Sequence, residues 1–567
     1  MASLKFHEFI PKSYLYLRNG YKFSIFKKDL VAGLTVGIIA LPLAMAFAIA
    51  SNVSPERGLY TAIIAGFLIS LLGGSRIQIG GPTGAFVGVV YGIIQRTGYQ
   101  GLCISMVIAA IILLLLGIFR IGSWIKYVPS PLVTGFTTGI AVIIFSTQIK
   151  DFFGLQMGTP PADFIEKWAS YCQAFPTFDP STVSLAAGTL GIILLIRRFS
   201  PWLPWGISAI VLATAVCMLF HLPVETIQSR FGEIPRSLPF PSFPSLFILA
   251  DRFKEIFVDG ITIAFLGAIE SLLSAVIGDG MIGGRHRSNC ELIAQGVANF
   301  GSVIFGGIPA TGAIARTATN VKTGAQTPVA GMIHALVLLL ILYCLAPIVS
   351  KIPLAALASV LVMVSWNMSE IGHFTRLLKA PQGDRLILLT AFFLTVFVDI
   401  TVAISAGMIL ASFLFMKRMS QLSKAVSFSQ IFQENDVDFP EKMDPNDISK
   451  KVVPKGVEVY EIQGPFFFGA ANMLRDLLNT ISLVPKVFIL RMRFVPMIDV
   501  SGMYGIEEFY TQCQKRGIVL FLSGVHGQIK QELKNFGLIN SIGEQRIFPT
   551  IDAAFAKAEE IISCSEG

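Results

Sequence analysis

Charged residues are scarce in this sequence. Lys, Arg, Asp and Glu make up 14% of its 567 residues, against about 25% in an ordinary soluble protein. Hydrophobic residues make up 53%, with 45 Phe among them. This composition excludes a water-soluble protein of this length and predicts a polytopic membrane protein. The net charge of +8 then indicates basic loops on one side of the membrane rather than nucleic-acid binding.

Several signatures of chemistry are also missing. The seven cysteines form no CxxC pair, so neither a disulfide framework nor a metal site is predicted. The sequence contains no GxGxxG and no phosphate-binding loop. We therefore expect no cofactor and no enzymatic activity. Residues 1–29 are basic and lack the pattern of a cleavable signal, so we expect them to stay in the cytoplasm.

Two related motifs interrupt the hydrophobic sequence. Residues 80–86 read GGPTGAF, and residues 306–323 read GGIPATGAIARTATNVKT. Proline presets a first helical turn and glycine permits close backbone approach, so each motif predicts a helix that begins abruptly at membrane depth. The free N–H groups of such a start are tolerated only around a cavity or an anion. Tight helix packing is the alternative for one motif, but the repeated pair favours a binding site.

Hydropathy divides the apolar region into two similar halves. We expect about fourteen spans, as seven plus seven, and an odd number per half places the halves in opposite orientations, as an inverted repeat. The motifs fall at the third and tenth spans, so these two helices are expected to be broken. The predicted segments are 30–50, 59–73, a helix from 83, 102–119, 127–149, 182–196, 203–220, 256–278, 290–304, a helix from 311, 327–349, 353–366, 386–398 and 400–416.

The distribution of loop charge predicts the orientation. With a cytoplasmic N-terminus, most basic loop residues fall inside, whereas the long mixed-charge loops 150–180 and 222–254 fall outside. Ser288 and Glu291 are spaced as a capping box at the start of the ninth span.

Composition changes after the last span. We divide the chain into a cytoplasmic segment at 1–29, a transmembrane domain at 30–417, a polar linker at 418–452 and a soluble domain at 453–567. Three predicted strands, 457–464, 486–495 and 518–525, alternate with amphipathic helices in the last part. This alternation predicts a small, mostly parallel α/β domain, which we expect in the cytoplasm.

Glu270 is the most informative single residue. It lies far from either end of the eighth span, where a carboxylate is costly and faces the bundle interior or water by default. Gly267, Glu270, Ser271 and Ser274 have helical spacing and predict one small, polar stripe. Burial favours the protonated carboxyl group, so Glu270 is a candidate proton carrier. The alternative is a structural pair with Arg316, and both roles can hold together.

Three further residues have competing interpretations. Asp399 is predicted at the turn between the last two spans, as an interfacial residue. His334 is predicted to be a hydrogen-bonded packing residue rather than a proton relay, because no second titratable group accompanies it. Phe47 is either a lipid-facing residue or an aromatic wall of the site, and periodicity does not decide between them.

From about residue 23 onward the chain resembles the SulP anion transporters, which include sulfate transporters, bicarbonate transporters and the animal proteins prestin and pendrin. The resemblance rests on LPLAMAFAIA and GLYTA near the first span, GGPTGAF, IESLLS in the eighth span, and the long run from ELIAQGVANF to VKTGAQTP. The C-terminal domain resembles the STAS domain.

The resemblance implies a core domain that slides against a gate domain, with the anion between the third and tenth helices. It places Glu270 and Ser274 where a bicarbonate-transporting relative binds sodium, and a glutamate there favours H⁺ over Na⁺ as the coupled ion. Many relatives carry a glutamine where this chain has Leu43, so one polar substrate contact differs. The residues it implies around the anion are Thr83, Gly84, Ala85, Gly312, Ala313 and Ile314, to which we add Phe47 and Arg316.

In the STAS-like domain, Asp499-Val500-Ser501-Gly502 matches the loop in which antagonist proteins carry a phosphorylated serine. Ser501 is therefore a possible regulatory phosphosite. An ordinary helix N-cap is the favoured interpretation of the same residue.

Together these features predict secondary active uptake of a small anion across the cytoplasmic membrane, with sulfate first and bicarbonate or a C4-dicarboxylate as alternatives. A passive anion channel or exchanger is a hypothesis of another class. The resemblance also implies a homodimer, and the STAS-like domain is a possible docking module for a cytosolic partner.

Overall fold

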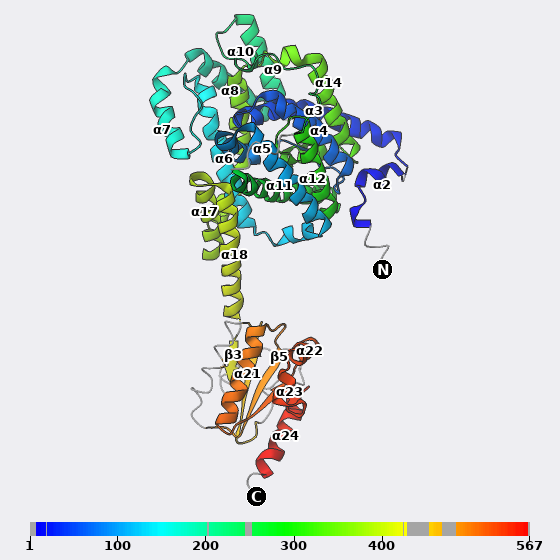
Figure 1. Ribbon diagram of the computed structural model, residues 1–567, viewed down its shortest axis with the longest axis vertical. Helices are drawn as coiled ribbons and strands as arrows, with labels where there is room; N and C mark the ends of the chain where they lie inside the picture. Colours follow the sequence, from blue (N-terminus) through cyan, green and yellow to red (C-terminus); the bar gives the residue numbers. More distant parts are fainter. Residues whose placement is uncertain are drawn as a thin grey trace. The chain divides into compact units, whose positions relative to one another are not determined.

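The computed structural model of the protein describes residues 7–18, 20–200, 203–243, 252–422, 424–427, 453–467, 474 and 484–564 (Figure 1). The chain divides into two compact units, Met1–Ile409 and Leu410–Gly567.

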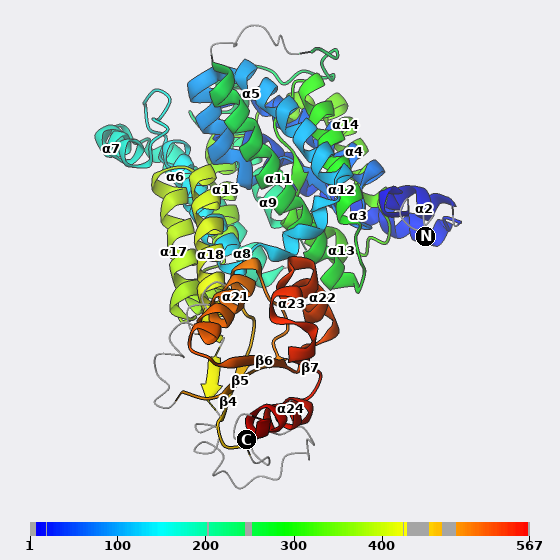
Figure 2. The ribbon, with the colours of Figure 1, turned by 60° about the horizontal axis from the view of Figure 1, so that its bottom comes forward.

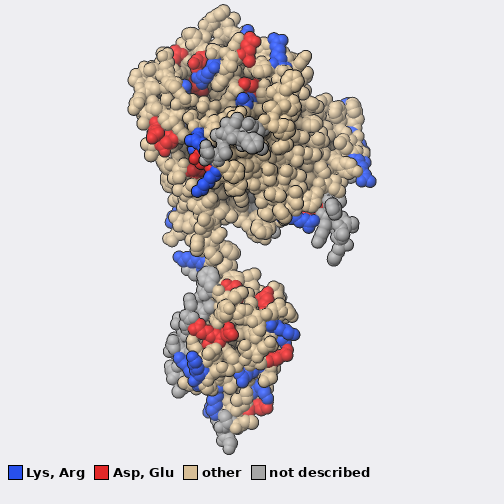
Figure 3. Space-filling view, viewed as in Figure 1, with Lys and Arg blue, Asp and Glu red and all other residues tan. Residues whose placement is uncertain are grey.

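The first unit is a bundle of long apolar helices. In the described part of the chain, nine helices are long and apolar enough to cross a membrane. Large apolar side chains such as Leu195, Leu219 and Leu340 are more than half exposed on this unit, and its surface has wide areas without charge (Figure 3). A surface of this kind faces lipid rather than water, which confirms a multi-pass membrane protein.

The helices follow the predicted spans. The elements of the first half are α3 (Phe23–Ala50), α4 (Pro55–Leu72), β1 (Gly80–Gly81), η2 (Gly84–Phe86), α5 (Val87–Ile118), α6 (Ser130–Phe153), α8 (Pro180–Phe199) and α9 (Trp205–Phe220). The elements of the second half are α11 (Phe253–Ile282), α12 (Ser288–Ile304), β2 (Thr311–Gly312), α13 (Ile314–Lys322), α14 (Val329–Val349), α15 (Leu354–Met368), α17 (Gln382–Phe397) and α18 (Ile400–Leu422).

Shorter helices lie before and between the long ones. They are η1 (His7–Phe9), α2 (Lys12–Arg18), η3 (Ile121–Tyr127), α7 (Phe164–Ala174), η4 (Phe175–Thr177), α10 (Ile227–Phe231) and α16 (Ile371–Leu377). The third and fourth predicted spans are both parts of α5, which is kinked at Gly98 with φ of 68°, a backbone conformation that glycine adopts readily.

The two halves meet at the two motifs. β1 pairs antiparallel with β2, with Gly80 opposite Gly312 and Gly81 opposite Thr311. Around this pair, helices of one half pack on helices of the other: α5 against α11 and α12, α14 against α3 and α4, and α15 and α17 against α6. Figure 2 shows α11 and α12 beside α5. The motifs therefore lie side by side although more than 200 residues separate them in the sequence.

Two buried aspartates occupy equivalent places in the two halves. Asp29 in α3 accepts hydrogen bonds from the N–H groups of Gln326 (2.7 Å) and Thr327 (3.1 Å), which follow α13. Asp259 in α11 forms an ion pair of 2.7 Å with Arg96, at the far end of the first broken helix. The first long helix of each half is thus tied to the end of the other half's broken helix, as expected of inverted repeats.

The second unit contains a five-stranded sheet in the order β3-β4-β5-β6-β7. The chain β4-β5-β6-β7 is parallel, and β3 joins β4 antiparallel at the edge, so the mostly parallel sheet is confirmed. Its elements are β3 (Lys424–Ser427), β4 (Val457–Gln463), β5 (Val487–Phe494), α21 (Val500–Lys515), β6 (Val519–Ser523), α22 (Gly527–Phe536), α23 (Leu538–Ile542), η7 (Glu544–Arg546), β7 (Ile547–Phe548) and α24 (Ile551–Cys564).

One local expectation about this unit needs revision, whereas the polar linker at 418–452 stays a prediction. Its residues 418–422 and 424–427 are helix and strand, and 423 and 428–452 lie outside the described residues. Ser501 is not an N-cap: Asp499 caps α21, accepting a hydrogen bond of 2.7 Å from the N–H of Gly502. A carboxylate two positions earlier provides a stronger acceptor for the free N–H group, and Ser501 is left exposed in the first turn.

Candidate anion-binding site

Each motif begins a helix inside the bundle, as predicted. The first continues from β1 into η2 at Gly84 and then α5, and the second from β2 into α13 at Ile314. The first N–H groups of each helix have no carbonyl of their own helix to bond and carry its positive dipole end. One predicted contact is already occupied, because the N–H of Ala313 donates to the carbonyl of Ile79 at 2.8 Å.

A buried guanidinium lies between the two helix starts. Arg316, in the first turn of α13, is 3% exposed, and its Nη2 donates to the carbonyl of Pro82 in the other motif. Its Nη1 is buried without a hydrogen-bond partner among the described residues. Gly81 makes room for it, since a Cβ there would lie 2.7 Å from Nη1. The site thus offers a positive charge with a free donor, and an unsatisfied buried donor costs about 1–3 kcal/mol.

The start of the first broken helix is enclosed by side chains from three other helices. A Cβ at Gly84 would lie 3.2 Å from the ring of Phe47, 2.8 Å from Ile144 and 3.0 Å from Met368. Phe47 is 6% exposed and lies beside Gly84, so it does not face lipid. The hydroxyl of Thr83 is buried and has no hydrogen-bond partner among the described residues. A side chain at position 84 would require these side chains to shift, so glycine keeps the start of the helix in close contact with an aromatic and apolar wall.

The polar stripe of α11 faces the two motifs, as its spacing predicted. Ser271 accepts from Gln78 Nε2 through its hydroxyl (3.0 Å) and its carbonyl (3.1 Å). The carbonyl of Gly267 accepts from Thr311 Oγ1 at 3.0 Å. Ser274 shares a hydrogen bond of 3.0 Å with Thr317. These contacts fix α11 against both broken helices.

Glu270 stands within this stripe and is 5% exposed. Among the described residues its carboxyl group has no hydrogen bond and no ion pair. The expected structural pair with Arg316 is therefore absent from this conformation. A buried carboxyl group without a cationic partner is stable mainly in its neutral form.

Sequence reasoning missed several residues that hold the site together. Gln78 fills the space in front of Gly312, where a Cβ would meet its amide. Thr317 accepts a hydrogen bond of 3.1 Å from the N–H of Ile79. Asn299 clamps Ala310, accepting from its N–H and donating to its carbonyl, both at 2.9 Å. These polar side chains sit inside apolar helices, which is the one signal that identifies them in the sequence.

Three other expectations have clear outcomes. Asp399 lies between α17 and α18 and accepts a hydrogen bond of 2.6 Å from the N–H of Thr401, which confirms the turn. His334 is fully buried, as a packing residue should be, but neither ring nitrogen has a regular hydrogen bond to a described residue. Glu291 does not complete a capping box; its carboxylate accepts instead from the N–H groups of Gly74 (2.9 Å) and Ser75 (3.1 Å).

Comparison with known proteins agrees with this architecture. Residues 26–391 match the sulfate permease family, and residues 449–554 match the STAS domain. The chain is 41% identical to the putative sulfate transporter YvdB of Bacillus subtilis, over 93% of this chain and 97% of that protein. It is 27% identical to the bicarbonate transporter BicA of Picosynechococcus sp., over 96% of each chain.

The fold matches a solved structure of the murine Slc26a9 anion transporter in the inward-facing state. The TM-score is 0.85 at 18% identity, over 99% of this chain and 95% of that one. At this identity the match shows the fold alone. A helical membrane unit with two broken helices, followed by a STAS domain, places this chain in the sulfate permease family of membrane anion transporters.

Proposed function

We propose that the protein is a secondary active transporter that takes up a small inorganic anion, sulfate first, across the cytoplasmic membrane. The observation that carries this proposal is the convergence of two helix N-termini, the buried Arg316 Nη1 and the Thr83 hydroxyl on one place. All of these groups are positive or can donate, and the two side-chain groups, Arg316 Nη1 and the Thr83 hydroxyl, lack a partner within the described residues. A bound oxyanion satisfies them together.

Sulfate is preferred over bicarbonate because of the similarity to YvdB, a putative sulfate transporter, at 41% identity. BicA, a bicarbonate transporter, is similar at 27% and supports bicarbonate as the second candidate. A C4-dicarboxylate is the third. Uptake of labelled sulfate, bicarbonate and succinate into proteoliposomes distinguishes them. Sulfate accumulation no higher than in empty vesicles contradicts the first choice.

The proposal includes proton coupling through Glu270. An anion beside Arg316 leaves an ionised Glu270 as a second negative charge in a medium of low dielectric constant. Protonation of Glu270 removes that repulsion, so a bound proton strengthens anion binding and a bound anion strengthens proton binding. Reciprocal coupling of this kind is typically about 1–3 kcal/mol.

Replacement of Glu270 by glutamine tests the coupling. Glu270→Gln keeps the shape of the protonated acid, so we expect sulfate exchange to continue while accumulation driven by an imposed pH gradient is lost. The parent in the same vesicles is the control, and a sodium gradient in place of the pH gradient tests Na⁺ coupling. If Glu270→Gln concentrates sulfate as well as the parent, Glu270 is not the coupling residue. If the parent cannot accumulate sulfate uphill at all, a channel or exchanger is the better description.

We further propose an elevator-like movement in which the broken helices travel together with α11 past the helices α6, α15 and α17. The hydrogen bonds of α11 to both motifs support its assignment to the moving part. We also propose cytoplasmic termini, a homodimer and a regulatory role for the STAS domain. Light scattering that finds only monomers in mild detergent would contradict the homodimer. Deletion of residues 453–567 without any effect on transport or assembly would contradict regulation.

A further inference from the structure

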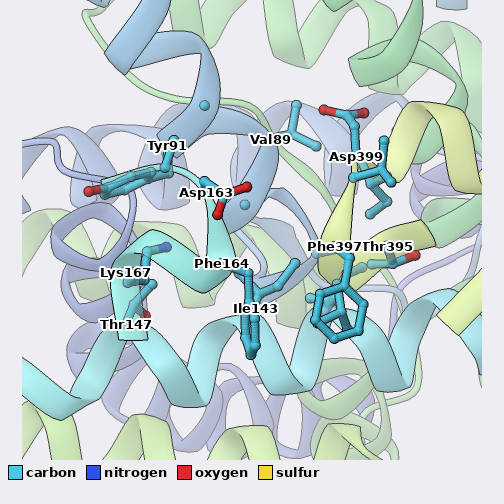
Figure 4. Close-up of a pocket in the computed structure, with 18 of the residues that line it drawn as sticks. Val89, Tyr91, Ile143, Thr147, Asp163, Phe164, Lys167, Thr395, Phe397 and Asp399 are labelled. Atoms are coloured by element: carbon cyan, nitrogen blue, oxygen red, sulfur yellow. The ribbon is translucent and has the colours of Figure 1, made fainter. Parts of the chain in front are cut away.

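A cavity of about 280 Å³ lies between α5, α6, α7 and the turn from α17 to α18 (Figure 4). The first broken helix lines one side of it, through Ala85 of η2 and Gly88, Gly92 and Arg96 of α5. Ala85 belongs to the candidate anion site, whereas the side chain of Arg96 is 46% exposed at the surface of the unit. The cavity therefore leads from the start of the broken helix to the side of the membrane that carries α7.

A buried lysine faces this cavity. Lys167 in α7 is 4% exposed, and its ammonium lies over the ring of Tyr91, 4.8 Å from the centroid. Among the described residues no carboxylate lies within ion-pair distance of this ammonium. In Figure 4, Lys167 and Tyr91 lie together, with Thr395, Phe397 and Asp399 toward the other end of the cavity. A buried ammonium with only an aromatic partner has unused capacity to bind an anion.

The acidic groups of the cavity wall already have other partners. Asp163 caps α7, accepting from the N–H groups of Ile165 (2.9 Å) and Glu166 (3.0 Å). Asp399 accepts from the N–H of Thr401 at the start of α18. The acidic partner of Arg96 is Asp259, outside the lining. Helix N-termini offset the charges of Asp163 and Asp399 in part, whereas Lys167 has no such compensation.

Several contacts hold Lys167 in this position. The hydroxyl of Tyr91 donates to the carbonyl of Pro160, which precedes α7. Trp168, next to Lys167, donates its Nε1–H to the hydroxyl of Ser146 in α6 at 3.0 Å. The ring of Phe164 packs edge-on against Phe397, with centroids 5.5 Å apart. The helix α7 is thereby fixed against α5, α6 and α17, so that its lysine stays at the cavity.

We propose that this cavity is an outer anion-binding vestibule, in which Lys167 holds the anion before it passes along α5 to the substrate site. The anion is a small oxyanion of the transported class, which accepts hydrogen bonds from the ammonium. The glycine at position 88 leaves room along α5, since a Cβ there would have only ordinary contacts, at 3.6 Å and more, whereas a Cβ at Gly92 would lie 3.2 Å from Nη1 of Arg96. This inference rests on the proposed transport function and on its outward assignment of the loop that contains α7.

The vestibule gives transport a dependence on external pH. Burial lowers the pKa of Lys167 to about 8, against the opposing influence of Asp163. Lys167 is therefore cationic below about pH 8 and loses its charge as the pH rises through this value, and anion binding is lost with it. The other titratable groups around it are Tyr91 and Tyr171, neutral phenols in this range, with Arg96 and Asp399 further along the cavity.

The test is sulfate self-exchange in membrane vesicles that contain the full chain, with equal pH on both sides so that the driving force is constant. In right-side-out vesicles we expect Lys167→Met to raise the external half-saturation concentration on the order of 10-fold, the effect of losing one charged hydrogen bond. The series is made in the Glu270→Gln background, because the proposed proton binding of Glu270 would itself make anion affinity depend on pH. In that background the chain with Lys167 should lose affinity as the pH rises through 8, and the chain with Lys167→Met should show no such change. Lys167→Arg should restore affinity at neutral pH and keep it at alkaline pH, because guanidinium stays charged.

Sidedness separates this role from a structural one. In inside-out vesicles, half-saturation from the cytoplasmic side should be the same for Lys167→Met and the parent. Two results would overturn the proposal. The first is an equal loss of affinity on both sides of the membrane in Lys167→Met that Lys167→Arg does not restore. The second is an external half-saturation concentration and a pH profile that Lys167→Met leaves unchanged. If the parent exchanges bicarbonate or succinate but not sulfate, the same series with that anion decides. A parent that exchanges no anion contradicts the proposed function, and the vestibule with it.

Discussion

Gly81 allows the guanidinium of Arg316 to reach the carbonyl of Pro82. It has φ of 146°, which residues with a side chain rarely adopt. In Gly81→Ala, the new methyl group would lie 2.7 Å from Nη1 and 3.3 Å from Nη2 of Arg316. The first distance is too short for any carbon–nitrogen contact, so either the guanidinium or the β1–β2 pair must move.

The expected loss follows from what the displaced guanidinium gives up. Its hydrogen bond to the Pro82 carbonyl is charge-assisted, and such bonds contribute about 1.5–3 kcal/mol. If the same displacement moves Nη1 away from the anion, a comparable loss of binding free energy raises the half-saturation concentration at least about 10-fold. The backbone strain of alanine at this φ costs about 1–3 kcal/mol of stability. We therefore expect both weaker sulfate transport and a lower thermal midpoint.

The assay is the initial rate of sulfate uptake into proteoliposomes as a function of sulfate concentration, with the thermal midpoint measured on the same purified protein. Gly188→Ala is the matched control: it lies in α8, and a Cβ there has no neighbour within 4 Å. Alanine in a helix is more favourable than glycine by about 1 kcal/mol, so the control should transport like the parent. A half-saturation for Gly81→Ala equal to that of the parent would refute the role assigned to Arg316.

Three further substitutions test the contacts around the site and in the STAS domain. Asp29→Asn should lower the thermal midpoint of the purified protein. The amide oxygen can still accept from the N–H groups of Gln326 and Thr327, but the amide NH₂ replaces Oδ2, which accepts from the hydroxyls of Tyr21 and Thr327, and a lost hydrogen bond to a charged group costs about 1.5–3 kcal/mol. An unchanged midpoint would contradict the tie between the halves. Thr317→Val should impair uptake and stability, because it leaves the N–H of Ile79 unpaired. Thr317→Ser keeps the hydroxyl and should retain both, so equal behaviour of the two variants would contradict the role of the Thr317 hydroxyl as acceptor for Ile79. Glu461→Ala removes one partner of a buried ion pair at 2.7 Å, which costs about 3–5 kcal/mol, so hydrogen exchange in β4 and β5 of the full chain should accelerate. Glu560→Ala, in an exposed pair, should change exchange little, and similar effects of the two variants would contradict the burial argument.

Much of the membrane unit was predictable because its signals are local. A long apolar run becomes a helix in lipid, since every backbone group must be satisfied within its own segment. Proline and glycine mark where such a helix must stop and restart. The two broken helices, the polar stripe of α11 and the parallel sheet of the C-terminal unit therefore matched the expectations from sequence, with shifts of a few residues.

Choices between hydrogen-bond partners were not predictable. Glu291 has capping-box spacing, yet its carboxylate reaches Gly74 and Ser75, more than 200 residues earlier. Ser501 looks like an N-cap, yet Asp499 takes that place. A local pattern shows which groups need partners, and the packed structure decides which acceptor is nearest.

The sequence by itself determined that this chain spans a membrane and begins two helices inside the bilayer, because those properties follow from composition and backbone chemistry. The assignment to anion transporters rested on the resemblance of its motifs to that family. Only the tertiary structure decided which side chains meet there. It placed Arg316 of one half on the Pro82 carbonyl of the other, left Glu270 without that arginine as a partner, and brought Lys167 from a loop helix onto a cavity that reaches Ala85. Such juxtapositions join residues that are far apart in the chain, and long-range packing of the two halves alone sets them.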